Sequence, residues 1–210
     1  MPIRDKAIGW KRRRIFLHPI DFASQWLEDG TSKVMTGQGA GTPVFAALGV
    51  AASELVGIAI GAAGDEVYAF LPIPWDLDPD YPVWARIWFT HDSTDADTPD
   101  WRVDFKLIKK QIAISDAKSS PDLTLTFAAK AVSTTSGALE VLQWEKGSLT
   151  FDEDDLAMMI AVECNGLGGA DADEIKFMGL ELAYTVRATV DVRETTKPTP
   201  EDDDTNPIAS

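Results

Sequence analysis

Two stretches near the middle of the chain alternate between apolar and other side chains with a period of two. In residues 81–90 one face carries Val83, Ala85, Ile87 and Phe89, and the opposite face carries Trp84, Arg86, Trp88 and Thr90. In residues 101–108 the apolar face carries Trp101, Val103, Phe105 and Leu107. Successive side chains of a strand point to opposite faces, so both stretches are predicted to be half-buried strands. The polar segment HDSTDADTPD between them predicts a loop, and we interpret the two strands as an antiparallel pair at the centre of an all-β domain.

Further strands are predicted on both sides of this pair. Short alternating stretches occur at residues 66–71, 122–127, 138–144 and 148–151, with a turn at 145–147. Residues 156–164 form a nearly continuous apolar run, which is typical of a strand buried on both faces. Residues 174–188 predict a long last strand whose shared face is Met178, Leu180, Leu182, Tyr184 and Val186. About eight strands with loops between them, and no alternation of strands with helices, indicate an antiparallel β-sandwich or barrel.

The first third of the chain has weaker patterns. Residues 13–20 predict a short strand that Pro19 confines to an edge, and residues 21–27 predict one helical turn. Residues 44–50 and 54–60 fit either two strands or a weak helix. The motif GQGAG lacks the Lys-Ser/Thr ending of a phosphate-binding loop, so we interpret it as a connector.

Composition and charge divide the chain into three parts. It has 210 residues, 45% of them hydrophobic, and a net charge of -15. Bases dominate the first fourteen residues and acids the last ten, so we expect an N-terminal arm at 1–42, a β domain at 43–192 and an acidic, proline-rich tail at 193–210. The basic arm either docks on an acidic neighbour or is a solvated tail. The acidic body lacks the basic face of a nucleic-acid binder.

Neither a disulfide framework nor a membrane segment is expected. Cys164 is the single cysteine and lies in an apolar run, which favours an inert core thiol and is compatible with folding in a reducing cytoplasm. Ser53 and Glu54 interrupt the apolar residues 43–63, so this stretch is not predicted to span a membrane. The apolar segment after the basic start is too short for a signal peptide, and none is predicted.

Acidic residues cluster in loops, at residues 76–80, 92–100, 152–155 and 171–173. A glycoside hydrolase needs two carboxylates held across a cleft, and calcium needs several oxygen ligands. The loop at 92–100 supplies oxygens but lacks the glycine and the closing glutamate of an EF-hand. Solvated turns are the simpler interpretation of these clusters. We therefore predict a non-enzymatic protein with no catalytic residue, no cofactor and no metal site.

Two histidines and two tryptophans are the remaining candidates for chemistry. His91 lies beside Asp92 and could help to bind a metal, but an exposed polar histidine is the favoured interpretation, and His18 is distant in sequence. Trp84 and Trp88 share a strand face, where they could stack on sugars. A pair in an interface or in the core is the favoured interpretation of these rings.

Three segments together resemble a known group of proteins. They are FLPIPWDLDPDYPVWARIWFT at 70–90, WRVDFKL at 101–107 and DEIKFMGLELAYTV at 173–186. Over roughly residues 66–186 the chain resembles the small jelly-roll proteins that decorate or cement the capsids of tailed bacteriophages. The resemblance implies an eight-stranded jelly roll, assembly as a trimer or pentamer on a shell, and arms that reach onto neighbouring subunits.

The main hypothesis is therefore a capsid cement subunit, a non-enzymatic virion protein made in the host cytoplasm and bound on the capsid surface between capsomers. Its partners would be the major capsid protein and further copies of itself. In this hypothesis Arg12, Arg13 and Arg14 of the arm pair with the acidic shell. The apolar anchors of the arm would be Trp10, Phe16 and Trp26. No nucleic-acid or membrane partner is expected.

The alternative hypothesis is a binding module. A jelly-roll domain of a phage tail or fibre would bind a receptor or a carbohydrate through Trp84, Trp88 and the acidic loops. An enzyme of the glycosidase kind is the weakest hypothesis, because no pair of acids lies in the predicted strands.

Overall fold

The computed structural model describes most of the chain between residues 12 and 186. The described residues are 12–26, 32–34, 44–47, 56–60, 65–91, 98–112, 120–152, 154–164 and 175–186. Within them the secondary structure is strands and one short 3-10 helix, η1 (Pro19–Phe22). The predicted all-β, antiparallel jelly-roll sandwich is therefore confirmed.

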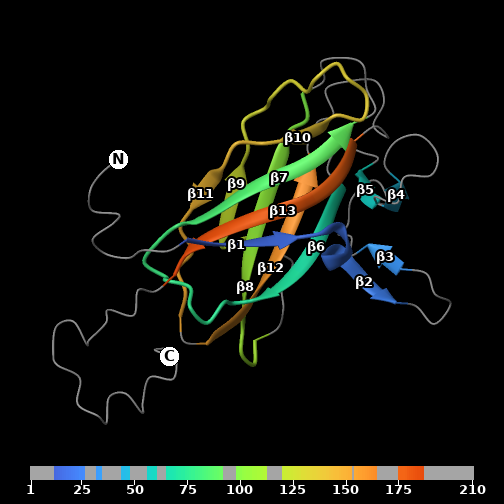
Figure 1. Cartoon of the computed structure of the whole chain (residues 1–210). Coiled ribbons are helices and arrows are strands. Elements are labelled where there is room, and N and C mark those ends of the chain that lie inside the picture. The colour runs from blue at the N-terminus through green and yellow to red at the C-terminus, as the bar shows by residue number, and fades with distance from the viewer. Residues whose placement is uncertain are drawn as a thin grey trace, which may run out of the picture.

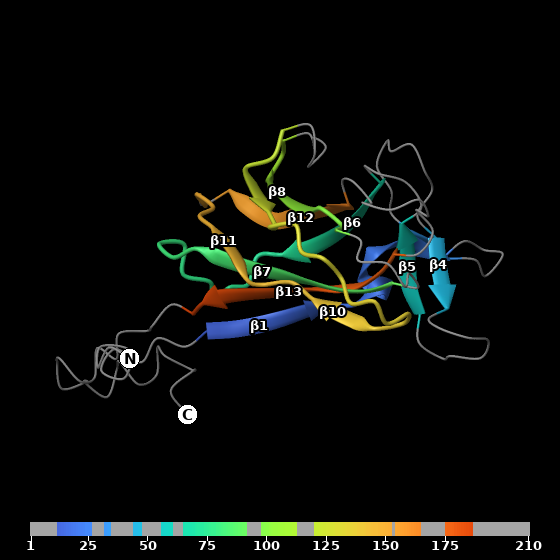
Figure 2. The same ribbon diagram turned by 90° about the horizontal axis from the view of Figure 1, so that it is seen from above.

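Two antiparallel sheets pack face to face (Figures 1 and 2). The first, here called the β7–β13 sheet, contains β1 (Arg12–Leu17), β4 (Val44–Ala47), β5 (Val56–Ile60), β7 (Val83–His91), β10 (Leu139–Val141), β11 (Glu145–Gly147) and β13 (Ile175–Thr185). The second, the β8–β12 sheet, contains β6 (Asp65–Pro72), β8 (Trp101–Lys109), β9 (Leu123–Thr126) and β12 (Asp155–Cys164). A separate pair is β2 (Ala23–Trp26) with β3 (Ser32–Val34).

The core lies between the two sheets and is filled by the inward side chains of both. Trp101 is 1% exposed, and its ring centroid lies 5.3 Å from that of Phe89 and 6.2 Å from that of Phe177. Phe89 and Phe177 come from one sheet and Trp101 from the other. Burial of large apolar side chains is the main driving force of such a fold, at about 25 cal/mol for each Å² removed from water.

The two alternating stretches at the centre of the chain are strands, as predicted, but they do not pair with each other. β7 pairs with β13, β10 and β11, whereas β8 pairs with β12 and β9. The predicted central antiparallel pair is therefore wrong, and the strands face each other across the core. Alternation tells which side chains are buried together but not which backbone is the hydrogen-bonding partner.

A β-bulge changes the predicted face of the last strand. β13 pairs with β7 at Phe177 and Phe89 and then at Gly179 and Trp88, so Met178 is an extra residue in the ladder. Phe177 is fully buried and Met178 is only partly buried. Met178 thus does not share a face with Leu180, contrary to the prediction, because the bulge shifts the alternation by one residue.

Shorter elements differ from the predictions in several places. Residues 145–147, predicted as a turn, form β11 against β7. Residues 21–27, predicted as a helical turn, contain the end of η1 and then β2. The ambiguous stretches at 44–50 and 54–60 contain two strands, β4 and β5, which pair with each other.

The N-terminal strand belongs to the sandwich. β1 pairs with β13 from Arg12 opposite Thr185 to Leu17 opposite Leu180. Ile15 and Leu17 pack in the core or against it, as the edge strand predicted for residues 13–20 requires. Residues 12–17 of the expected arm are thus part of the β domain, and the expected tail at 193–210 lies outside the described residues.

Glu140 attaches a long connection to the sandwich and makes a testable contribution to stability. Its carboxylate accepts hydrogen bonds from the amide of Ser133 at 2.9 Å and from Lys130 at 3.2 Å. Burial raises the pKa of Glu140, but these bonds and the nearby His91 lower it by more, so its pKa lies below the ordinary value. Glu140 therefore stabilises the fold above the unfolded-state pKa, and the contribution is lost as the pH falls through the folded-state pKa.

We expect Glu140→Gln to lower the free energy of unfolding by about 1 kcal/mol at neutral pH. Urea unfolding of the variant and of the unchanged protein should give converging values as the pH falls to about 3, where the glutamate is protonated in the unfolded chain. Asp80→Asn, at an exposed turn, is the control and should change little. A difference that stays constant with pH would show that the charge of Glu140 is irrelevant.

Candidate ligand-binding face

The outward face of the β7–β13 sheet carries an unusual group of side chains, here called the tryptophan face. It is formed by Arg12, Arg14, Phe16, Trp84, Arg86, Trp88, Trp144 and Glu181. Trp84, Trp88 and Trp144 are each partly exposed. The face lies over β1, β13 and β7, three neighbouring strands that Figure 1 shows side by side.

Register explains why these residues meet. β7 points Val83, Ala85, Ile87 and Phe89 into the core, so Trp84, Arg86 and Trp88 point outward. On β13, Glu181 lies opposite Arg86, and on β1 Phe16 lies opposite Glu181. Directly opposite residues of an antiparallel pair share a face, so three strands each place a side chain around the same point.

Glu181 is the centre of the face. Its carboxylate accepts hydrogen bonds from Nε of Arg86 at 2.6 Å, from Nε1 of Trp88 at 3.3 Å and from Arg14 at 3.4 Å. The side chain of Glu181 is only 8% exposed, and that of Arg14 is 64% exposed. A buried carboxylate is stable only with such partners, so Glu181 fixes the positions of Arg86 and Trp88.

The guanidinium groups lie over the indole rings. Arg12 lies 4.3 Å from the ring centroid of Trp84, and Arg86 lies 5.1 Å from that of Trp88 and 4.6 Å from that of Trp144. At these distances a cation is attracted to the ring face, and planar guanidinium groups stack on aromatic rings. The result is a layer of indoles and guanidinium groups held on a rigid sheet.

This arrangement suits binding rather than catalysis. Partly exposed indoles offer apolar area that is ordered at little cost in conformational entropy, and the exposed guanidinium edges offer hydrogen-bond donors. The one carboxylate at its centre accepts hydrogen bonds from three donors, all of them on this sheet. These strands do not carry the pair of carboxylates, held across a cleft, that glycoside hydrolysis requires.

The residues predicted for the interface of the arm lie in different parts of the structure. Arg12, Arg14 and Phe16 belong to the tryptophan face, where Phe16 contacts Trp88 edge to face with 5.8 Å between centroids. Trp26 ends β2, and Trp10 lies outside the described residues. Arg13 points to the other side of β1 and forms an ion pair with Asp76 at 2.9 Å. The structure thus brings together three of the six residues predicted for an interface.

Arg13 takes part in a polar group at one end of the core. Asp76 is 4% exposed and also accepts a hydrogen bond from the hydroxyl of Tyr184 at 3.1 Å. Burial and this hydrogen bond raise the pKa of the Tyr184 hydroxyl, although Arg13 opposes the shift. The group ties β1 and β13 to the connection after β6, which is a structural role.

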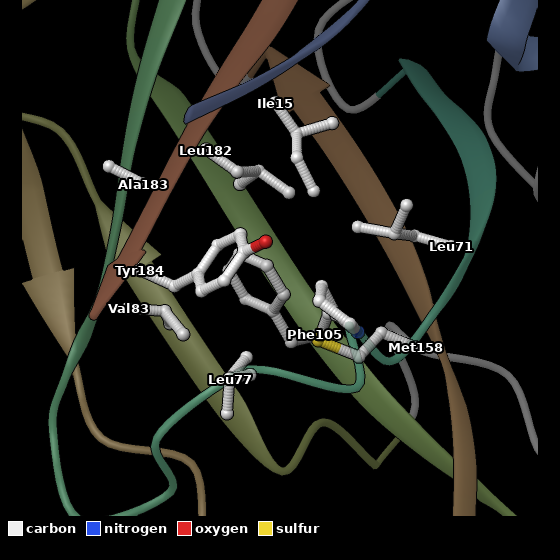
Figure 3. Close-up of a pocket in the computed structure, with 10 residues that line it drawn as sticks. Ile15, Leu71, Leu77, Val83, Phe105, Met158, Leu182, Ala183 and Tyr184 are labelled. Carbon is white, nitrogen blue, oxygen red and sulfur yellow. The ribbon is translucent and has the colours of Figure 1, made fainter. Parts of the chain in front are cut away.

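A cavity between the sheets, lined by described residues, is small. Its volume is about 10 Å³, and it is lined by apolar side chains that include Ile15, Leu71, Phe105 and Met158 (Figure 3). Such a space holds at most one water molecule, so it is not a sugar or cofactor site.

Acidic and histidine side chains elsewhere do not form a metal site in the part of the chain that the structure describes. No group of three or more His, Cys, Asp or Glu residues there has an arrangement that could hold an ion. His91 is buried, 1% exposed, which corrects the interpretation of it as an exposed polar histidine. Its Nε2 lies 4.0 Å from Glu140. Most of the acidic loop after it, residues 92–97, lies outside the described residues.

The opposite sheet carries a buried charged group. Arg102 donates to Asp104 at 2.7 Å and lies 4.0 Å from Glu163. The hydrogen bond to Asp104 raises the pKa of Arg102, in opposition to the effect of burial. Asp104 also accepts a hydrogen bond from Thr124 on β9. These contacts join β8, β9 and β12, so we interpret the group as structural.

Sequence reasoning identified part of the tryptophan face and missed the rest. The shared face of Trp84 and Trp88 was predicted and is confirmed. Arg86 was assigned to the same face but not to the site, although its place between two tryptophans was a usable signal. Glu181 and Trp144 were not singled out, because the strand pairings that bring them to β7 are absent from the sequence pattern.

No helix in the described residues combines the length and apolar composition needed to cross a bilayer. A comparison with family models finds no match, and a comparison with curated proteins finds none either.

Solved structures with a similar arrangement of strands do exist. The C-terminal CBM6 of LamC, a marine laminarinase from Zobellia galactanivorans, has a TM-score of 0.42 at 4% identity, over 81% of this chain and 98% of that one. CBM35 from Cellvibrio japonicus Abf62 has a TM-score of 0.40 at 8% identity, over 81% and 92%. The xylan-binding module CBM15 has a TM-score of 0.42 at 10% identity, over 83% and 97%.

Proposed function

We propose that this protein is a non-catalytic binding module that takes a carbohydrate on the tryptophan face. The observation that carries the proposal is the group of three partly exposed tryptophans on the outer side of one sheet, Trp84 and Trp88 on β7 and Trp144 beside them under Arg86. Aromatic rings pack against the apolar faces of sugars, and neighbouring polar groups donate to the hydroxyls. The proposal corresponds to the alternative hypothesis drawn from the sequence.

Rigid support favours this use of the face. β13 is hydrogen-bonded on both sides, by β7 and by β1, and Glu181 holds Arg86 and Trp88 in place. A binding site held by its scaffold loses little conformational entropy when the ligand binds. Trp84 and Trp88 would contact the sugar rings, and Arg86 would donate to the ligand oxygens between them.

The test is a glycan array followed by affinity electrophoresis in gels that contain the bound polysaccharide. We expect Trp84→Ala and Trp88→Ala each to weaken binding at least about tenfold, which is about 1.4 kcal/mol. Trp75→Ala is the matched control, because Trp75 is 70% exposed but lies in the connection after β6. Thermal unfolding of each variant separates loss of binding from loss of fold.

Absence of binding to every glycan would contradict the proposal, as would equal binding by all three variants. Loss of binding only in Trp75→Ala would move the site to the corner after β6. The role as a capsid cement subunit, the trimer or pentamer and the location on a virion stay predictions from the sequence resemblance. Binding to purified shells, unaffected by Trp84→Ala and Trp88→Ala, would favour them over the proposal made here.

A further inference from the structure

We propose that the tryptophan face selects acidic glycans, with sugars that carry carboxylate or sulfate groups, over neutral ones. This inference rests on the proposed function and concerns the chemical class of the ligand. It follows from the charges on the face, from their exposure and from the contrast with the rest of the chain.

The charges that the register places on this face are mostly positive. Arg12 and Arg14 come from β1, Arg86 from β7, and Lys146 of β11 lies opposite Trp84 and is exposed. Lys176, further along β13, is on the same face and buried. Among the described strands of the β7–β13 sheet, Glu181 is the carboxylate on this face.

Glu181 cannot neutralise this excess of positive charge. Arg86 makes the short contact to Glu181, at 2.6 Å, and its side chain is 23% exposed. Arg14 is 3.4 Å away, and its side chain is 64% exposed. Arg12 is exposed and lies over Trp84. Two guanidinium groups and one ammonium group therefore remain available beside the indoles.

The whole chain has a net charge of -15, so a positive face is a local exception to its composition. A chain whose charge served solubility alone would gain nothing from concentrating arginines on one sheet face. Guanidinium groups bind carboxylate and sulfate groups through paired hydrogen bonds, and flat rings between them bind the sugar body. Arginine and tryptophan side chains at alternate positions would bind the acidic groups and the sugar rings of such a chain together.

Single-stranded nucleic acid is the other polyanion that uses rings and cations together. Its backbone needs a positive groove that continues over many nucleotides. Here the tryptophan face covers only part of a domain whose net charge is negative, so repulsion by the remaining surface is expected to weaken the binding of a long phosphate chain. The acidic glycan is therefore the favoured ligand, and binding to poly(dT) is the alternative result that the test can give.

The experiment compares polygalacturonate with its fully methyl-esterified form, which has the same backbone without the charge. Isothermal titration calorimetry on the full chain should give at least about tenfold tighter binding to the charged form. Arg12→Gln with Arg14→Gln should remove that preference, so that the double variant binds the charged and the esterified polymers with the same affinity. Lys110→Gln, an exposed base outside this face, is the control and should retain the preference. The affinities for dextran sulfate and for dextran give the same comparison for sulfate groups.

The outcomes separate this inference from the proposed function. Equal binding to the charged and esterified polymers, lost in Trp88→Ala, would overturn the selection of acidic glycans and retain the binding module. No binding to any polysaccharide would overturn both. Tighter binding to poly(dT) than to polygalacturonate, lost in the double arginine variant, would replace the acidic glycan with nucleic acid.

Discussion

Gly179→Ala is expected to lower the free energy of unfolding by about 3–4 kcal/mol, the largest effect predicted for this protein. Gly179 has a φ angle of +145°, which residues other than glycine rarely adopt. A Cβ atom there would lie 2.6 Å from the carbonyl oxygen of Leu17 and 2.6 Å from the ring of Phe16. The ring can rotate away, but the carbonyl belongs to the backbone of β1. The alanine would therefore push β1 away from β13.

Gly137→Ala is the matched control for this effect. Gly137 also has a positive φ, +76°, but a Cβ atom there would meet nothing within 4 Å. Its substitution tests backbone strain without a clash and should cost about 1 kcal/mol. Urea unfolding measures both variants. Equal losses at the two positions would show that contact with β1 contributes nothing.

Displacement of β1 has a second consequence. Arg12, Arg14 and Phe16 reach the tryptophan face only while β1 is paired with β13. Gly179→Ala should therefore weaken ligand binding even under conditions in which the rest of the sandwich remains folded. The bulge and its glycine thus support both the edge of the sheet and the site on it.

The same glycine illustrates what sequence reasoning could reach in this fold. Strict alternation in residues 83–89 correctly assigned Trp84 and Trp88 to one face and Phe89 to the core, because it reflects a property of a single strand. The bulge at Gly179 is a property of two paired strands, and its signal within residues 174–188 is the glycine itself, which the alternation pattern does not take into account. Alternation carried through the bulge placed Met178 on the wrong face.

Partner choice limited the prediction of the site more than strand detection did. β7 and β8 are neighbours in sequence and were expected to pair, but the chain crosses between sheets after His91. The true neighbour of β7 is β13, which lies almost a hundred residues later. Glu181 could therefore not be linked with Arg86 without the fold. Trp144 lies between two strands of three residues each, which are too short to show a period.

Glu181→Ala is expected to lower the free energy of unfolding by about 2–3 kcal/mol and to abolish ligand binding. Removal of the carboxylate leaves Arg86, whose side chain is 23% exposed, beside two indole rings without its counter-charge. It also leaves the Nε1 of Trp88 without its acceptor on Glu181. The expected loss is smaller than for a fully buried ion pair, because Arg14 and part of Arg86 are screened by water.

A double-mutant cycle distinguishes this explanation from general damage to the sheet. Arg86→Leu combined with Glu181→Leu removes both charges and keeps apolar volume, so it should recover much of the stability that Glu181→Leu alone loses. The double variant should still fail to bind glycans, because it lacks the donor between Trp84 and Trp88. If the double variant is as unstable as the sum of its single variants, the ion pair is not the reason for the loss. If it is stable and binds normally, the tryptophans alone form the site, and Glu181 serves only to compensate for the buried charge of Arg86.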